Sequence, residues 1–168
     1  ITAWTVTSKS ILGADVPFGR YLFNSVIVTA CGVGGSLVLS SLCAYSLSKL
    51  MRRKTASVLL LLYLGTIMIP GIMTLIPTYE LFNRFNLLDT LFCLFIGAWF
   101  SPMTVYFFKG FFDALPKELL ESAKIDGAGE LRIFRNIVLP LSKPVFSAMT
   151  ILSFIPLWND FLWPFLTV

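Results

Sequence analysis

Side chains that could perform chemistry are few in this chain of 168 residues, and their types exclude several kinds of site. The sequence contains no histidine, and its three cysteines, Cys31, Cys43 and Cys93, all fall inside long apolar runs. Metal centres and disulfide frameworks are built from these two residue types. We therefore expect no metal, no cofactor and no catalytic residue, and we interpret the cysteines as small apolar packing residues.

Ionisable side chains are most numerous between Lys109 and Lys143, where six basic and five acidic residues give a net charge of +1. A DNA-binding helix-turn-helix needs a strongly basic face to neutralise phosphates, so nucleic acid is not an expected partner. The sequence also lacks a G-x-x-x-x-G-K-[ST] loop, and it has no Gly-Lys pair at all. The chain is therefore not expected to be an enzyme, and any ATP hydrolysis would belong to a partner chain.

A second polar group, Trp158-Asn159-Asp160, places an amide and a carboxylate among aromatic residues. Asp160 follows Lys143 by 17 residues, about 25 Å along a helix, so it should reach the far membrane interface. Two interpretations stay open. These residues could anchor the chain in the aromatic belt of the interface. Alternatively, they could line a translocation path in which sugar hydroxyls and ring faces dock.

The elements that must position these groups are long apolar runs. The chain is 57% hydrophobic and 13% charged, with a mean hydropathy of +0.83, outside the usual balance of a soluble domain. Three uncharged runs of 28, 25 and 19 residues can each cross a bilayer, which takes about 20 residues. We expect one all-α, polytopic transmembrane helix bundle over residues 1–168. Its four spans would lie at about 21–48, 55–79, 90–109 and 144–166.

Basic residues are distributed unevenly between the loops. Ten of the thirteen lie in residues 49–54 and 109–143, so the positive-inside rule places both segments in the cytoplasm. Residues 1–20 and 80–89 would then lie outside. A chain that starts outside normally needs an earlier span to export it, and this one does not begin with methionine. We therefore expect that both ends of a longer protein are missing.

Small residues and prolines indicate how the spans pack. A small residue recurs at every fourth position of the first span, which predicts a stripe where another helix backbone can approach closely. The stripe consists of Gly32, Ser36, Ser40, Ala44 and Ser48. Prolines are expected to interrupt and bend the later spans, because proline removes a helical hydrogen bond. They are Pro70 and Pro77 in the second span, Pro102 in the third and Pro156 in the fourth.

Residues 113–140 are predicted to form a compact helical knob. Pro116 suits a first helical turn, and Gly127 and Gly129 suit a left-handed exit, so one helix should cover about 116–126. A second should cover about 130–139. Their apolar stripes would be Leu115, Leu119 and Ala123 on the first helix, and Leu131, Phe134 and Val138 on the second. Such a knob between two spans can transmit force to a partner, whereas a flexible loop cannot.

The spacing within the knob resembles the EAA signature of binding-protein-dependent ABC importer permeases. That signature is EAA, three residues, G, nine residues and I-x-LP. Here it reads Glu121-Ser122-Ala123, then Gly127, then Ile137, Leu139 and Pro140. Ser122 replaces the usual alanine, which should do little harm to the helix because serine is small and can bond its own backbone. The resemblance implies that these residues, with Asp126, dock and couple an ATPase.

Further matches extend over nearly the whole chain and resemble the carbohydrate-uptake branch, specifically the shorter permease of the maltose type. They are Asn24-Ser25, Ala44-Tyr45, Ile69-Pro70, residues 76–79, residues 125–128 and residues 158–161. This resemblance implies the type I importer permease fold, with spans two to five of a six-span subunit present here. It also implies a prokaryotic inner or plasma membrane location.

The resemblance further implies the partners and the mechanism. The partners would be a dimer of ATPase subunits, a second homologous permease, an extracytoplasmic solute-binding protein, the lipid bilayer and a solute, most simply a carbohydrate. Closure of the ATPases would drive alternating access. Glycerol phosphate, polyols and polyamines remain alternative solutes. A secondary transporter or passive channel is the alternative class, although mid-membrane ionisable residues, common in secondary transporters, are absent from the three long runs.

Overall fold

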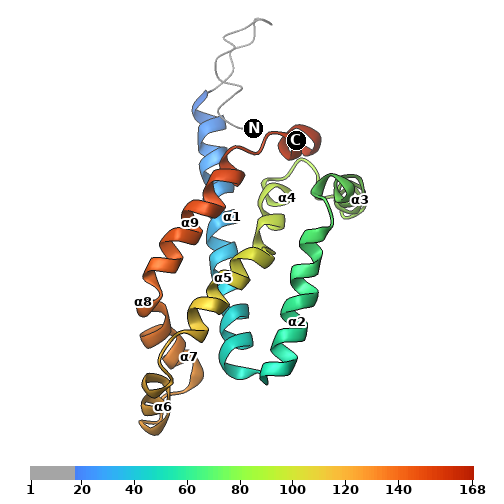
Figure 1. Ribbon diagram of the computed structural model, residues 1–168. Helices are drawn as coiled ribbons and strands as arrows, with labels where there is room; N and C mark the ends of the chain where they lie inside the picture. The colour runs from blue at the N-terminus through green and yellow to red at the C-terminus, as the bar shows by residue number, and fades with distance from the viewer. Residues whose placement is uncertain (1–17) are drawn as a thin grey trace, which may run out of the picture. The chain divides into compact units, whose positions relative to one another are not determined.

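The computed structural model describes residues 18–168, and every regular element in that range is a helix (Figure 1). The predicted all-α fold is therefore confirmed for this part of the chain. The prediction that residues 1–20 lie on the exterior side falls mainly on residues 1–17, which are outside the described residues. The α-helices are α1 (Phe18–Tyr45), α2 (Arg53–Gly65), α3 (Gly71–Arg84), α4 (Leu91–Phe95), α5 (Pro102–Asp113), α6 (Lys117–Ile125), α7 (Glu130–Ile133), α8 (Leu139–Leu141), α9 (Lys143–Trp158) and α10 (Leu162–Thr167).

Helix α1 continues into a π-helical turn, η2 (Ser46–Leu50), so that Gly19–Leu50 forms one helix of 32 residues. By length and composition this helix can cross a membrane. Three further helix pairs are bent at a short break. If each bent pair counts as one span, the described part of the chain holds up to four spans.

Two of the four prolines stand at helix breaks. After α2, a 3-10 turn, η3 (Thr66–Met68), leads to Pro70, which caps the start of α3 with an extended backbone. Pro102 occupies the first turn of α5, where its missing N–H removes no helical bond. Pro77 and Pro156 lie inside α3 and α9, and both helices continue through them. The expectation that these two interrupt their helices is wrong.

The chain divides into two compact units. The first contains the described residues up to Ser36, with Ile69–Phe100 and Leu152–Val168. In it, α10 is attached to α4, because Trp163 Nε1 donates to the Cys93 carbonyl at 2.9 Å. The Asp89 amide also donates to the Thr167 carbonyl at 2.9 Å. Trp99, in the 3-10 turn η4 (Ile96–Trp99), donates to the Cys31 carbonyl of α1 at 3.0 Å.

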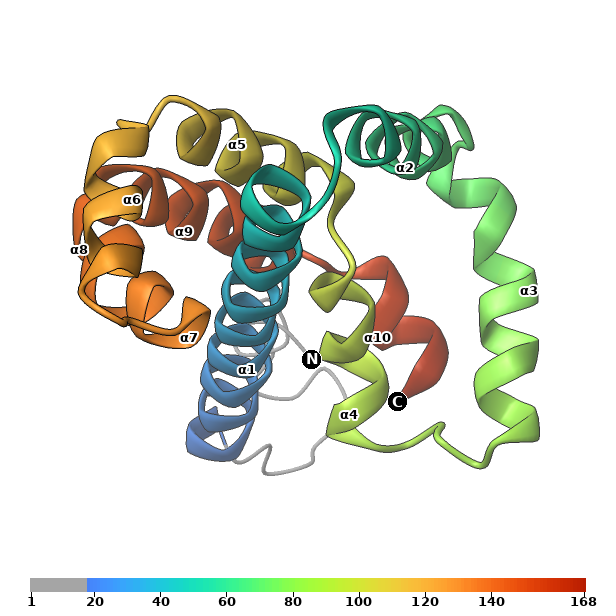
Figure 2. The ribbon, with the colours of Figure 1, turned by 90° about the horizontal axis from the view of Figure 1, so that it is seen from below.

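The second unit contains Leu37–Met68 and Ser101–Ile151. Its core is built from the end of α1, from α5 and from the segment after α7, with Ala44, Phe108, Phe112 and Val138 fully buried. Seen from below, α5, α6 and α7 gather beside the C-terminal end of α1 (Figure 2). This core holds residues 113–140 against the first long helix.

Four of the five residues of the predicted small-residue stripe are buried, and the fifth, Ser48, is partly exposed. Ser36, Ser40 and Ala44 are each at most 2% exposed. A Cβ added at Gly32 would collide with Leu157 and come within 3.3 Å of Phe95. In the first unit, the stripe is thus the place where α4 and α9 approach the backbone of α1 closely.

Candidate functional site

Helix α6 and the turn that follows it form the centre of residues 113–140. The helix begins after Pro116 and ends at Ile125, close to the predicted 116–126. Its end is a Schellman motif, in which the Ala128 amide donates to the Ala123 carbonyl at 2.9 Å and the Gly127 amide to Lys124 at 3.0 Å. Gly127 has φ of +75°, the left-handed conformation that this motif requires.

Gly129 does not share the left-handed role that the sequence assigned to both glycines. Its φ of −69° and ψ of 160° are extended, and it caps the start of α7. Any residue can adopt this conformation, so only Gly127 needs to be glycine for its backbone.

The second helix of the segment has an irregular middle. Helix α7 passes into a π-helical turn, η5 (Phe134–Val138), and then into α8, so that one helical run covers Glu130–Leu141. This run is bent by 76° from α9 at the break around Ser142. The predicted helix at about 130–139 is present, and its middle is a π turn instead of regular α-helix.

The buried faces of both helices differ from the predicted stripes at one position each. On α6, Leu120 is buried while Leu119 is 45% exposed, although Leu115 and Ala123 do pack against the core. On the second helix, Phe134 and Val138 are buried as expected. There, Ile133 replaces Leu131, which is 75% exposed. Ile125 at the end of α6 is also exposed, at 86%. Leu119, Ile125 and Leu131 therefore form an exposed apolar set, called here the tip residues.

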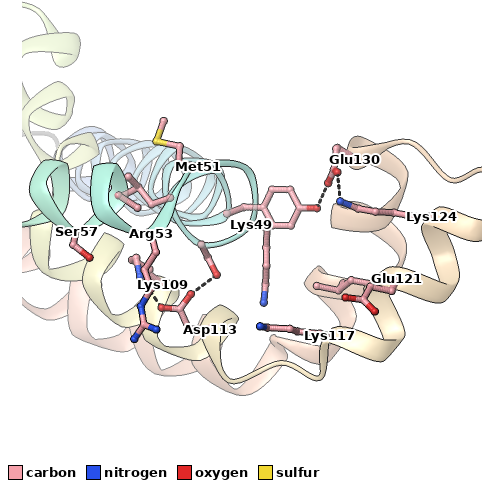
Figure 3. Close-up of a pocket in the computed structure, with 15 residues that line it drawn as sticks. Lys49, Met51, Arg53, Ser57, Lys109, Asp113, Lys117, Glu121, Lys124 and Glu130 are labelled. Carbon is pink, nitrogen blue, oxygen red and sulfur yellow. Dashed lines mark hydrogen bonds and ion pairs between the residues drawn. The ribbon is translucent and has the colours of Figure 1, made fainter.

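A polar network ties α7 to the end of the first long helix. Tyr45 Oη donates to Glu130 Oε2 at 2.6 Å, and Lys124 Nζ forms an ion pair with Glu130 Oε1 at 2.6 Å (Figure 3). Glu130 lies in the segment between the third and fourth expected spans. The hydrogen bonds from Lys124 and Tyr45 hold the pKa of its carboxyl below the usual range, although partial burial acts in the opposite direction.

A second polar link joins the same helix end to α5. Ser48 Oγ donates to Asp113 Oδ1 at 2.5 Å, and Lys109 Nζ contacts Asp113 Oδ2 at 2.6 Å (Figure 3). Asp113 therefore accepts from residues on two different helices. Together, these links attach the start of residues 113–140, at Asp113, and the start of α7, at Glu130, to the last turns of the first long helix.

These two links were not foreseen from the sequence. Tyr45 was noted only as part of the Ala44-Tyr45 family match, and Asp113 only as one acid in a mixed charge cluster. The one available signal was the spacing of Lys109 and Asp113, four residues apart on a helix, which favours an ion pair. The partners Tyr45 and Ser48 come from 85 and 65 residues away, and no local pattern indicates them.

The residues of the EAA signature divide into an inner and an outer group. Ala123, Ile137 and Leu139 are partly buried against the core of the second unit. The outer group is exposed and consists of Glu121, Ser122, Asp126, Gly127 and Pro140. Ser122 Oγ donates to the Leu119 carbonyl at 3.1 Å, so its hydroxyl bonds its own helix as expected. The signature therefore combines attachment to the core with an exposed outer surface.

A cavity of about 620 Å³ lies between the end of the first long helix, α2, α5 and α6 (Figure 3). Five basic and three acidic side chains line it: Lys49, Arg53, Lys109, Lys117 and Lys124, with Asp113, Glu121 and Glu130. All of these residues belong to the second unit. No local sequence pattern indicates this cavity.

Trp158, Asn159 and Asp160 lie at the end of α9 in the first unit. Asn159 Nδ2 donates to the Ile155 carbonyl of its own helix at 2.7 Å, and the Trp163 amide donates to Asp160 Oδ1 at 3.4 Å. Trp158 stacks on Phe154, with ring centroids 5.4 Å apart. Trp158 and Asp160 line a cavity of about 40 Å³ with Asn24, room for a few waters only. A role of these residues in a translocation path stays a prediction.

The Tyr45 hydroxyl should contribute measurably to stability. Tyr45→Phe removes the donor to Glu130 and leaves the Lys124 ion pair, so we expect a loss of about 0.5–1.5 kcal/mol in the free energy of unfolding. The side chain of Glu130 is 40% exposed, which places the effect below that of a fully buried bond. Thermal melting of the purified permease measures it. Tyr63→Phe is the control, because no hydrogen bond from the Tyr63 hydroxyl occurs among the described residues. Equal melting shifts for both variants would contradict this role for Tyr45.

Apolar helices that can span a membrane, with a short polar helical segment between two of them, define an all-helical polytopic membrane protein. The profile of the family described as binding-protein-dependent transport system inner membrane component matches residues 36–167. The chain belongs to this family, which confirms the resemblance drawn from the EAA spacing and places the chain in the inner membrane.

Curated relatives agree with this assignment. The chain is 38% identical over 152 residues to the sn-glycerol-3-phosphate transport system permease protein UgpE of Yersinia enterocolitica. It is 34% identical over 154 residues to the UgpE protein of Salmonella choleraesuis. These matches cover 90% and 92% of this chain, and 54% of each relative. The chain thus spans about half the length of the curated relatives it matches.

A solved structure supports the fold. A bacterial ABC transporter involved in the import of the acidic polysaccharide alginate matches with a TM-score of 0.78 and 27% sequence identity. The match covers 92% of this chain and 59% of that one. The predicted type I importer permease fold is therefore confirmed.

Proposed function

We propose that this chain forms the membrane-spanning permease of an ATP-driven importer, and that residues 113–140 couple it to a separate ATPase dimer. Family membership supports the importer class. The observation that carries the coupling role is the two-sided construction of this segment. Its inner residues are fixed to the first long helix by a packed core and by the Tyr45–Glu130 and Ser48–Asp113 bonds. Its outer residues are exposed.

The tip residues are the proposed contact with the ATPase. Large apolar side chains at 75% and 86% exposure, as at Leu131 and Ile125, lose contact with water when a partner covers them. Glu121 and Asp126, exposed on the same helix and its cap, add charges for recognition. Because the segment packs against the core and is bonded to the first long helix at Asp113 and Glu130, movement of the partner would be carried to the helices on either side. Alternating access follows when that movement opens the path to one side and closes it to the other.

Replacing Ile125 tests the contact. Burial of an isoleucine side chain is worth about 1.5–3 kcal/mol, so Ile125→Asp should weaken ATPase binding by roughly 10- to 150-fold. ATP-driven uptake into proteoliposomes should fall with it. Ile125→Val is the matched control, because it keeps an apolar side chain at the same place and should retain most binding. Copurification of the ATPase with the full-length permease measures the first effect. Unchanged binding of the Asp variant would contradict the docking role.

The proposed solute is a sugar or oligosaccharide, delivered by an extracytoplasmic binding protein to this permease and a second, homologous one. Glycerol phosphate is the second candidate, favoured by the named function of the UgpE relatives. Uptake of labelled sugars and of labelled glycerol phosphate by the reconstituted importer distinguishes the two. A passive channel or secondary transporter differs from both, because it would move solute without ATP or an ATPase.

A further inference from the structure

The 620 Å³ cavity of the second unit contains more positive charge than its own acids neutralise. Two of its three carboxylates are already paired, Asp113 with Lys109 and Glu130 with Lys124. Glu121 remains, against Lys49, Arg53 and Lys117. Among the described residues, no carboxylate oxygen lies within 4.0 Å of these three cations. The cavity therefore keeps a surplus of two positive charges.

Two of the three unpaired cations, Lys49 and Lys117, converge. Figure 3 shows the ammonium groups of Lys49 and Lys117 directed into the same space, one from the π turn after α1 and one from the first turn of α6. Like charges repel, so an arrangement that gathers them around an open volume favours an anion inside it. A phosphate group, with several strong acceptor oxygens, can accept from two ammonium groups at once.

The position of the cavity relative to the apolar helices favours a lipid as the source of such a phosphate group. Lys49 ends the uncharged run 21–48, and Arg53 begins α2, so the cavity lies where two apolar helices reach their polar ends. Lipid phosphates occupy this level of a bilayer. Met51 lines the cavity, and neighbouring Leu50 is 52% exposed, which provides apolar surface beside the charges. The basic bias of residues 49–54 and 109–143 places this end in the cytoplasm, where anionic lipids attract Lys and Arg.

We propose that this cavity binds the phosphate headgroup of an anionic phospholipid. Lys49 and Lys117 contact the phosphate, Arg53 adds positive charge to the same cavity, and the acyl chains lie against the apolar surface beside Met51 and Leu50. Because Lys117 belongs to α6, a bound headgroup also holds the amino end of that helix in place. This last consequence rests on the proposed coupling function, whereas the binding itself does not.

Lipid titration of the purified full-length permease tests the proposal, with bound lipid counted by native mass spectrometry. Phosphatidylglycerol should bind at least tenfold more tightly than zwitterionic phosphatidylcholine. Each cation removed near a membrane surface weakens attraction by about fivefold, so Lys49→Gln with Lys117→Gln should weaken phosphatidylglycerol binding by roughly 25-fold. The double variant Lys49→Arg with Lys117→Arg keeps both charges and should retain binding.

The matched control removes two charges of the same kind outside the cavity. Lys54 and Lys143 are exposed and do not line it, so Lys54→Gln with Lys143→Gln should leave the preference within about twofold, the usual scale of surface changes. Equal affinity for the two lipids, or an equal loss in both pairs of variants, overturns the proposal. Displacement of phosphatidylglycerol by millimolar inorganic phosphate overturns the lipid source and assigns the cavity to a soluble phosphate. None of these measurements requires the ATPase, so they stand apart from the test of coupling.

Discussion

Gly127→Val is expected to abolish most ATP-driven uptake while leaving the permease in the membrane. Gly127 has φ of +75°, and an L-residue in the left-handed region costs about 1–2 kcal/mol, more when it is β-branched. No atom lies within 4 Å of the position that its Cβ would occupy, so the penalty comes from the backbone and not from a clash. A penalty of this size shifts the population of the native turn by roughly 5- to 30-fold. Uptake by the importer reconstituted with its ATPase and binding protein measures the loss.

Gly129→Val is the matched control two residues away. Gly129 has an extended backbone, and a Cβ there also meets nothing within 4 Å, so this substitution lacks the left-handed penalty. We expect it to retain most uptake. Full uptake by the Gly127 variant, at normal abundance, would show that the geometry of this turn does not matter for coupling. An equal loss of uptake in both variants would mean that the bulk of the added side chain, and not the left-handed backbone, causes the effect.

The helices of residues 113–140 could be predicted because their signals are local. Pro116, the acids near the start of α6 and Gly127 at its end act within one or two turns, and the helix observed at Lys117–Ile125 follows them closely. The long apolar run of α1 is equally local, and so is its stripe of small residues. A local signal gave a wrong prediction at Pro77 and Pro156, which were expected to interrupt their helices. A helix can continue through proline where its surroundings permit.

Which face of each helix is buried could not be predicted, because tertiary packing decides it. Leu119 and Leu120 are adjacent and equally apolar, so periodicity alone cannot select between them. The core of the second unit takes Leu120 and leaves Leu119 exposed. On the second helix, Phe134 and Val138 are buried as their spacing predicts, but the core takes Ile133 and leaves Leu131 exposed, which the spacing does not indicate.

The central segment of the candidate site could be predicted from the sequence, but the bonds and cations around it could not. The spacing from Glu121 to Pro140 identified the segment and the family. The bonds that attach the segment, and the cations around the cavity, come from five helices between Tyr45 and Glu130. No sequence pattern indicates that Lys49 and Lys117 line the same cavity, so only the structure reveals the cavity.

The second large effect is expected at Gly35, where α1 meets the indole of Trp99. A Cβ built on Gly35 would fall against the ring itself, at Nε1, Cε2 and Cδ1. The ring cannot easily move away, because Nε1 donates to the Cys31 carbonyl at 3.0 Å and the ring packs against Phe92 and Phe95. Gly35→Val should therefore destabilise the permease by about 1–3 kcal/mol, the range of overpacked cores. Thermal melting of the purified permease, followed by tryptophan fluorescence, measures both the loss and the displaced indole.

Gly34→Val is a stringent control for this contact, since it makes the same substitution one residue earlier on the same helix. Gly34 is exposed, and a Cβ there meets nothing within 4 Å, so valine adds no collision. Glycine is also a poorer helix former than valine. Its melting temperature should stay level or rise slightly. If both variants have the same melting temperature, any loss of stability comes from placing valine in the helix. The close approach of Trp99 would then not be a stabilising contact. If only Gly35→Val loses stability and shifts the fluorescence, the missing side chain at Gly35 is what lets the indole bond the backbone of α1.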